Sequence, residues 1–238
     1  MTVKIPPKFR AFREMVLDEA NEALFVGYLE EYTAGGRYTG AYFNEVTATT
    51  GSHPDRIDVS DVVALSLLSV TVKPEAANYF LADSKDREEL SRRLSAQPDR
   101  DLASLTAGEV AAVEAGNLND AWNLIAKAPG VGRTRTSKLL ARKRPRLIPI
   151  WDSVISDVLG LSGTKDMWKI FHAALSEDMS HLGGSTTLDE RLGELGDLAG
   201  VSDRYSRLRV LDILAWMHGK KAGLPPTVYT ELMDEPKD

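Results

Sequence analysis

A lone carboxylate that follows a glycine-containing turn and a basic segment is the part of this chain most suited to chemistry. The turn is residues 128–133, Ala-Pro-Gly-Val-Gly-Arg, and the carboxylate is Asp152, which ends the sequence Pro-Ile-Trp-Asp. Pro129 stops a helix that we expect from about Asn119 to Lys127, and a second helix is expected after the turn. This order predicts contact with a DNA backbone beside a candidate catalytic acid.

The turn itself is suited to a phosphate. Gly130 and Gly132 permit positive backbone dihedrals, and they leave no side chain at the tip apart from Val131 between them. A phosphate can approach the N–H groups of Gly132 and Arg133 at the open end of the second helix, where unused donors and the helix dipole favour an anion. We therefore expect Gly130, Val131, Gly132 and Arg133 to contact DNA.

Charge is distributed unevenly along the chain. Its formal net charge is −6, yet residues 121–151 contain no acidic residue and eight basic ones, namely Lys127, Arg133, Arg135, Lys138, Arg142, Lys143, Arg144 and Arg146. The rest of the chain has 21 basic against 35 acidic residues, or −14. On the second helix Arg135, Lys138 and Arg142 share one face, which we expect to meet phosphates while another face packs. The polarised charge favours local nucleic-acid contact. The alternative is an ordinary helical hairpin with a solvated basic helix.

The turn and its flanks resemble a known signature. Residues 124–136, Leu-Ile-Ala-Lys-Ala-Pro-Gly-Val-Gly-Arg-Thr-Arg-Thr, are similar to the helix-hairpin-helix motif of the DNA glycosylase superfamily, the base-excision-repair enzymes that include endonuclease III and the adenine glycosylases. In that superfamily an aspartate follows the hairpin by about two dozen residues, closes a Pro/Val-rich segment and opens a helix. Asp152 matches in spacing and in surroundings, and the similarity covers residues 117–158.

The sequence departs from the superfamily pattern at two points. Members that also cleave the strand have a lysine two residues after the second glycine, where this chain has Thr134, so the resemblance implies at most monofunctional base removal. Several members hold an iron–sulfur cluster with four cysteines, but this chain has no cysteine, and we expect no cofactor. The whole chain, including residues 61–70 and 138–147, also resembles an actinobacterial family of unknown function, which supplies no activity.

Two interpretations of Asp152 stay open. Base removal builds positive charge on the deoxyribose, and a carboxylate near C1′ stabilises that cation or helps to activate water. N–H donors at the expected helix start, the dipole and the basic segment favour the charged carboxylate. Aspartate is also a preferred N-cap residue, so a purely structural role explains the same facts.

Aromatic residues supply candidates for a pocket wall. Trp151 adjoins Asp152 and would stack on an extruded base, although its apolar neighbours favour a core position. Tyr38 and Tyr42 follow the glycines at positions 35 and 36, and they line a pocket or begin a helix. The four histidines lack metal-ligand spacing, so we expect no metal site.

The elements that position these residues are predicted to be helices throughout. Periodicity indicates one long or broken N-terminal helix ending near positions 35 and 36, and a further helix that starts at Pro74. Other helices are expected over about 58–70, 83–95, 107–115, 166–175, 187–198 and 203–217. In the last helix Leu208, Leu211 and Trp216 predict a broad apolar face in the core. The resemblance adds two helical lobes around a pocket. We expect an N-terminal helical region (1–104), a helix-hairpin-helix segment (105–165), C-terminal helices packing on the N-terminal region (166–220) and a tail (221–238).

Three functions remain open from the sequence. The first is a helix-hairpin-helix DNA-binding protein that acts as a monofunctional glycosylase, with Arg133, Arg135 and Lys138 on phosphates and Asp152 at the N-glycosidic bond. The second is a non-catalytic module that binds DNA or RNA through the same hairpin, and the third is a helical protein–protein interaction module with an acidic partner. Because no apolar stretch is long enough for a membrane span and no signal peptide is evident, a cytoplasmic protein is expected.

Overall fold

The protein is built from α-helices joined by short turns. The computed structural model describes residues 3–46, 53–163, 165–182 and 187–222, and no strand occurs in these ranges. The first half contains α1 (Pro7–Leu17), α2 (Glu22–Thr33), α3 (Val59–Leu67), α4 (Pro74–Leu81), α5 (Lys85–Ser95) and α6 (Ala107–Ala115). The second half contains α7 (Asn117–Ala126), α8 (Arg133–Lys143), α9 (Ser153–Leu159), α10 (Met167–Ser176), α11 (Leu188–Leu198) and α12 (Arg207–Lys221). The predicted all-α class is confirmed.

Local sequence explains where most of these helices begin. Asp58, Thr106 and Thr187 each form a capping box, in which the side chain accepts from the third helical N–H and the third residue's carboxylate accepts from the cap N–H. Pro7 and Pro74 occupy the first helical position, where a missing N–H costs nothing. Such caps satisfy donors that would otherwise lie unpaired at each helix start.

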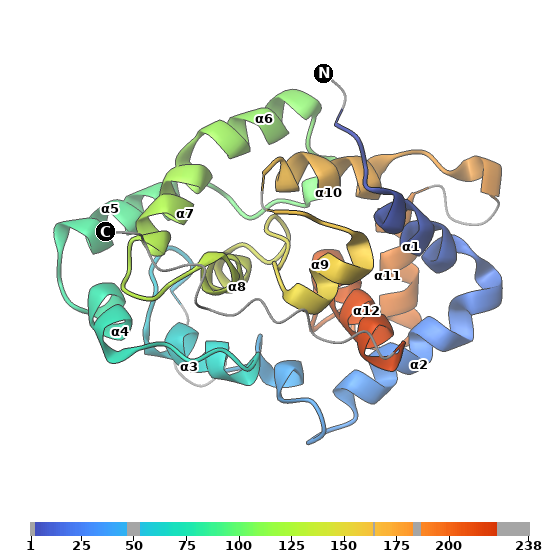
Figure 1. The fold of residues 1–238 in the computed structure, drawn as a ribbon, viewed down its shortest axis with the longest axis horizontal. Helices are drawn as coiled ribbons and strands as arrows, with labels where there is room; N and C mark the ends of the chain where they lie inside the picture. The colour runs from blue at the N-terminus through green and yellow to red at the C-terminus, as the bar shows by residue number, and fades with distance from the viewer. Residues whose placement is uncertain (1–2, 47–52, 164, 183–186, 223–238) are drawn as a thin grey trace.

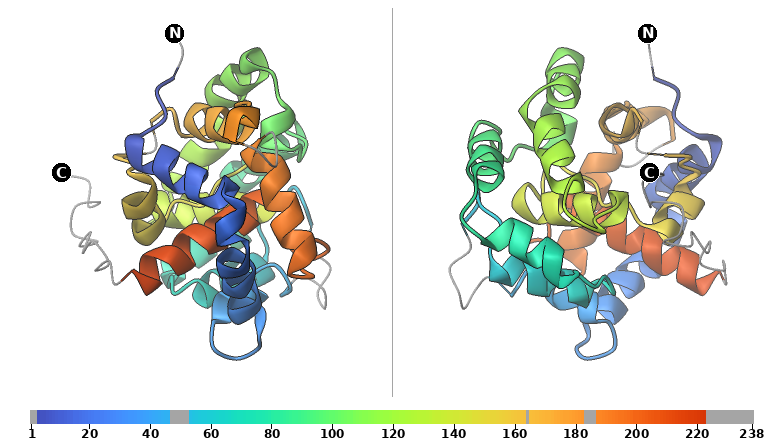
Figure 2. Two further views of the ribbon diagram at one scale, coloured as in Figure 1. Left: turned by 90° about the vertical axis from the view of Figure 1, so that its right-hand side faces the viewer. Right: turned by 60° about the vertical axis from the view of Figure 1, so that its left-hand side comes forward.

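The helices contact one another in two sets. In the first, α12 packs against α2, α9 and α11, while α1 packs against α9 and α11. In the second, α8 packs against α3 and α7, and α7 packs against α5 and α6. α10 touches both sets through α6 and α11. Figure 1 shows the N-terminal helices in blue beside the C-terminal helices in orange and red, and both views of Figure 2 keep them together. The two ends of the helical chain therefore close on each other.

α8 lies near the middle of the molecule in Figure 1. Its Leu139 and Leu140 are fully buried, and they join a core that extends from Phe9 of α1 to Leu214 of α12. Because α8 carries both this apolar face and the basic segment, its position fixes where the segment's charges lie.

The N-terminal helix, which was expected to be long or broken, is broken at Asp18, where extended backbone separates α1 from a short 3-10 turn and α2. α12 begins and ends about four residues later than the helix predicted over 203–217. Of the expected tail, residues 223–238 lie outside the described residues. Among the described helices, none has the length and apolar character needed to cross a membrane.

Candidate active-site pocket

A pocket of about 780 Å³ opens where the start of α8, the start of α9 and the end of α12 face the segments that follow α2 and α3. Its lining includes seven of the site residues predicted from the sequence, namely Tyr38, Gly132, Arg133, Arg135, Lys138, Trp151 and Asp152. The hairpin α7–α8 and the carboxylate after it thus contribute to one concave site.

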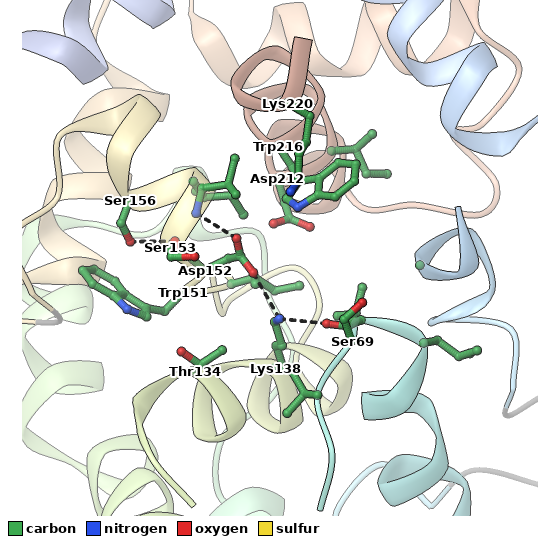
Figure 3. A pocket seen from close by; sticks show the side chains of 18 of the residues that line it. Ser69, Thr134, Lys138, Trp151, Asp152, Ser153, Ser156, Asp212, Trp216 and Lys220 are labelled. Atoms are coloured by element: carbon green, nitrogen blue, oxygen red, sulfur yellow. Dashed lines mark hydrogen bonds and ion pairs between the residues drawn. The ribbon is translucent and has the colours of Figure 1, made fainter. Parts of the chain in front are cut away.

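Asp152 stands at the centre of this pocket and is the N-cap of α9. Its Oδ1 accepts the N–H of Val154 at 3.0 Å, and its Oδ2 lies 3.2 Å from the Nζ of Lys138 (Figure 3). The side chain remains 19% exposed. Asp152 therefore caps the helix with one oxygen, and it presents a carboxylate to the pocket at the same time.

The sequence predicted Lys138 to be an exposed phosphate ligand, but in the structure its side chain is buried. Its side chain is only 4% exposed, and its ammonium also donates to the carbonyl of Leu68 at 3.2 Å. Burial lowers the pKa of Lys138 because the ammonium loses water, while the Asp152 carboxylate partly opposes that shift. The residue is a buried counter-ion of Asp152 and does not belong to a solvated face.

The rest of the expected basic face is also folded inward. Arg142 donates from Nε to Asp61 at 2.8 Å, and Lys143 pairs with the same carboxylate. Arg144 pairs with Asp55 at 2.5 Å and donates to the carbonyl of Leu94. All three cations are buried. The i, i+3, i+7 spacing placed Arg142 and Lys138 on one face correctly, but that face packs, because acceptors from α3 and from the loops that precede α3 and follow α5 surround it.

Two cations of the basic segment lie near solvent at the pocket, while Lys127 and Arg146 are exposed outside its lining. Arg133 is exposed, and its guanidinium lies 5.9 Å from the ring centroid of Trp151. Arg135 is half-buried and donates to the carbonyl of Thr71 at 2.9 Å. Arg37 and Lys220 also line the pocket, and both are exposed.

The two glycines of the turn behave differently. Gly130 has φ +69°, a left-handed conformation that favours glycine, whereas Gly132 has φ −91° and is extended. Val131 is buried, and its N–H donates to the carbonyl of Ala128 at 3.0 Å. Gly130 lies at the exposed tip, outside the pocket lining. Glycine permits a positive φ at both positions, but only Gly130 adopts one, and Gly132 serves as the N-cap of α8.

Of the three aromatic candidates, two line the pocket. Trp151 is 8% exposed and contributes to both core and pocket, and Tyr38 is half-buried in the opposite wall. Tyr42 is 40% exposed and is absent from the lining described for this pocket. It ends a 3-10 turn, Thr39–Tyr42, whose buried members are Gly40 and Ala41.

α12 supplies pocket residues that sequence reasoning missed. Asp212, Trp216 and Lys220 fall at i, i+4 and i+8, and all three line the pocket. Figure 3 shows them on α12, across Asp152 from Lys138 in that view. Trp216 is half-buried at the wall, so its predicted place inside the core needs correction. Asp212 was a signal, because it interrupts the otherwise apolar run of residues 210–217.

The lining carries more positive than negative charge. Its cations are Arg37, Arg133, Arg135, Lys138, Arg209 and Lys220, and its carboxylates are Asp152 and Asp212. Lys138 pairs with Asp152, and the buried Arg209 pairs with Asp212. The remaining four cations stand at the rim, so a protein of net charge −6 presents a locally positive pocket. Such a pocket favours an anionic ligand around a central carboxylate.

These features define an all-helical protein with one carboxylate-centred, cation-rimmed pocket beside a glycine-containing helical hairpin. The chain belongs to DUF6308, a family of unknown function, whose model matches residues 25–219. No curated protein and no solved structure matched the chain. Functional argument therefore depends on the pocket itself.

Proposed function

We propose that this chain is a helix-hairpin-helix DNA-binding protein that removes a base by cleaving its N-glycosidic bond, with Asp152 as the catalytic carboxylate. The observation that carries the proposal is the position of Asp152, which follows the hairpin and projects its carboxylate into a pocket rimmed by cations. A carboxylate so placed stabilises the positive charge that develops on the sugar as the base leaves.

The surroundings of Asp152 suit that role in two ways. Lys138 and the N–H of Val154 both contact its carboxylate and hold it in place at the pocket. Arg133 and the first N–H groups of α8 lie at the same rim, and they would hold a phosphate of the strand. The two sets of helices correspond in this proposal to two lobes that enclose the extruded nucleotide.

Thr134 limits the reaction to base removal in this proposal. It lines the pocket on α8, and its hydroxyl offers no amine to attack the sugar. Strand cleavage through Thr134 is therefore not expected.

The test compares a short duplex that carries a cationic abasic-sugar analogue with a matched normal duplex. We expect the wild-type chain to bind the cationic duplex more tightly and Asp152→Asn to lose that preference. Asp157→Asn, an amide change on the same helix outside the described lining, is the control. Equal binding of both duplexes by the wild type would overturn the catalytic assignment.

A second candidate is a non-catalytic nucleic-acid-binding module. It is favoured by the fact that both oxygens of Asp152 already have structural partners, Val154 and Lys138. The module needs only the rim cations. Arg133→Gln should therefore reduce the slope of log affinity against log salt concentration by about one. Arg146→Gln is the matched control, because Arg146 pairs with Asp101 at 3.1 Å away from the pocket. Failure to bind any nucleic acid at low salt would leave a protein–protein module.

A further inference from the structure

Three aromatic rings form a connected wall on the α12 side of the pocket. Tyr32 and Tyr38 stack with centroids 5.5 Å apart and planes 10° from parallel. The ring of Trp216 meets both edge-on, at 6.1 Å from Tyr32 and 5.6 Å from Tyr38. All three residues line the pocket. Tyr38 also donates its hydroxyl to Glu31 at 3.1 Å, and Tyr32 accepts from the guanidinium of Arg209 at 2.9 Å, so the wall is held rigidly.

Each aromatic residue at the rim carries a cation over its ring. Arg37 lies 5.4 Å from the centroid of Tyr38, Lys220 lies 5.5 Å from that of Trp216, and Arg133 faces Trp151. Arg37 is 70% exposed on its side chain and also pairs with Glu31 at 2.8 Å. These cations are long, exposed and easily displaced from the ring faces.

The magnitudes favour replacing such a cation by a nucleobase. A cation over an exposed ring contributes roughly two- to fivefold in an equilibrium constant. A base stacked on an aromatic side chain contributes roughly five- to 150-fold. The displaced ammonium or guanidinium remains within reach of the adjacent phosphate, so it would pair with that phosphate. Alternation of rings and cations is the arrangement by which proteins hold unpaired strands.

The basic segment offers little to a paired helix. A duplex is bound through phosphates spread over a broad face, yet Lys138, Arg142, Lys143 and Arg144 are buried and paired. Of the segment's other cations, Arg133 and Arg135 lie at the pocket rim beside the rings, whereas Lys127 and Arg146 are exposed outside the lining. The site is therefore matched to a strand whose bases are free to stack.

We propose that the wall formed by Tyr38 and Trp216, with Arg37 and Lys220, binds an unpaired segment of a DNA strand, so that the protein prefers single-stranded or locally unpaired DNA to intact duplex. The inference rests on the proposed nucleic-acid function, and it names the substrate class of that pocket. A base lies on the exposed part of Trp216 or Tyr38, while Lys220 and Arg37 move to the flanking phosphates.

The experiment measures the affinity of the full chain for one fluorescent single strand and for the duplex of the same sequence. We expect the single strand to bind at least about tenfold more tightly, which is the contribution of one or two stacked bases. Trp216→Ala should remove most of this preference and Trp216→Phe should retain it, since a phenyl ring still stacks. Tyr42→Ala is the matched control, because it removes an exposed aromatic ring outside the described lining.

A second measurement guards against a variant that fails to fold. Lys220→Gln changes an exposed side chain, and we expect it to lower the salt slope for the single strand by about one unit. Equal or tighter binding of the duplex by the wild type would overturn the inference, as would unchanged single-strand affinity in both Trp216→Ala and Lys220→Gln. Neither readout uses Asp152. A wild-type protein that shows no preference for the cationic-sugar duplex would therefore overturn the catalytic proposal and leave this one standing.

Discussion

The ammonium of Lys138 lies 3.2 Å from the carboxylate of Asp152, and the two residues belong to neighbouring elements 14 positions apart. One is almost fully buried, while the other is open to the pocket. Burial without a partner would be costly for the ammonium, and the Asp152 carboxylate offsets part of that cost. The pocket carboxylate therefore has a dedicated counter-ion.

Replacing that counter-ion should change how strongly Asp152 attracts a cation in the pocket. In Lys138→Met the carboxylate loses its nearest cation, so its negative charge is no longer partly offset. We expect the preference for the cationic abasic-sugar duplex over the normal duplex to increase by roughly fivefold, which corresponds to about 1 kcal/mol. The measurement is the affinity of wild type and Lys138→Met for both duplexes at one pH and one salt concentration.

Lys138→Arg provides the control for that change, because guanidinium restores a cation beside Asp152 without restoring the shape of lysine. A duplex preference that returns to the wild-type value in the arginine variant supports the electrostatic explanation. Equal preferences for wild type and Lys138→Met would contradict it, and they would leave Lys138 as a packing residue.

The second prediction concerns the stability contributed by Asp61 of α3, whose carboxylate pairs with two buried cations. Its side chain has no exposed area, and it accepts from Arg142, Lys143 and the N–H of Asp58. Asp61→Asn leaves these cations without a buried anion, which should lower the free energy of unfolding by about 3–5 kcal/mol in urea titrations. Asp101→Asn breaks the half-exposed pair with Arg146 and should cost at most about 1 kcal/mol. Equal losses would show that burial does not matter here.

The helices were predictable from sequence because their signals are local. Asp58 and Thr187 lie within three residues of the N–H groups that they cap, and Pro74 acts at the first position of its own helix. The proximity of the hairpin to Asp152 was also predicted, since few residues separate α8 from α9. A short connection limits how far apart the two helices that it joins can lie.

Burial of the basic segment was not predictable in the same way. Arg142 meets Asp61 across 81 positions, and Arg144 meets Asp55 across 89. Helical periodicity tells which residues share a face, but the acceptors that surround the face come from distant segments. Trp216 illustrates the same limit, since only the packing of α12 against α2 and α9 brings it to the pocket.

His218 should make stability depend on pH. Its ring lies 5.6 Å from that of Phe12, and burial lowers the pKa of His218 below its ordinary value of 6.5. Below about pH 6.5 the unfolded chain then binds a proton that the folded chain does not. The free energy of unfolding therefore decreases as the pH is lowered, and it levels off below the folded pKa. Urea titrations should show this slope for the wild type and not for His218→Phe. His181→Asn, an exposed histidine, should keep the slope; a slope retained in His218→Phe would assign it to another group.

The two glycines of the hairpin should differ in their tolerance of a side chain. Gly130 has φ +69°, and a Cβ there would lie 3.1 Å from the Cδ of Lys73, so Gly130→Ala combines backbone strain with a close contact. We expect it to lower the free energy of unfolding by about 1–2 kcal/mol. Gly132→Ala should change stability much less, because φ −91° is open to any residue. Denaturant titrations of the two variants make the comparison. If Gly132→Ala were the more damaging change, close approach at the start of α8 would matter more than the left-handed turn.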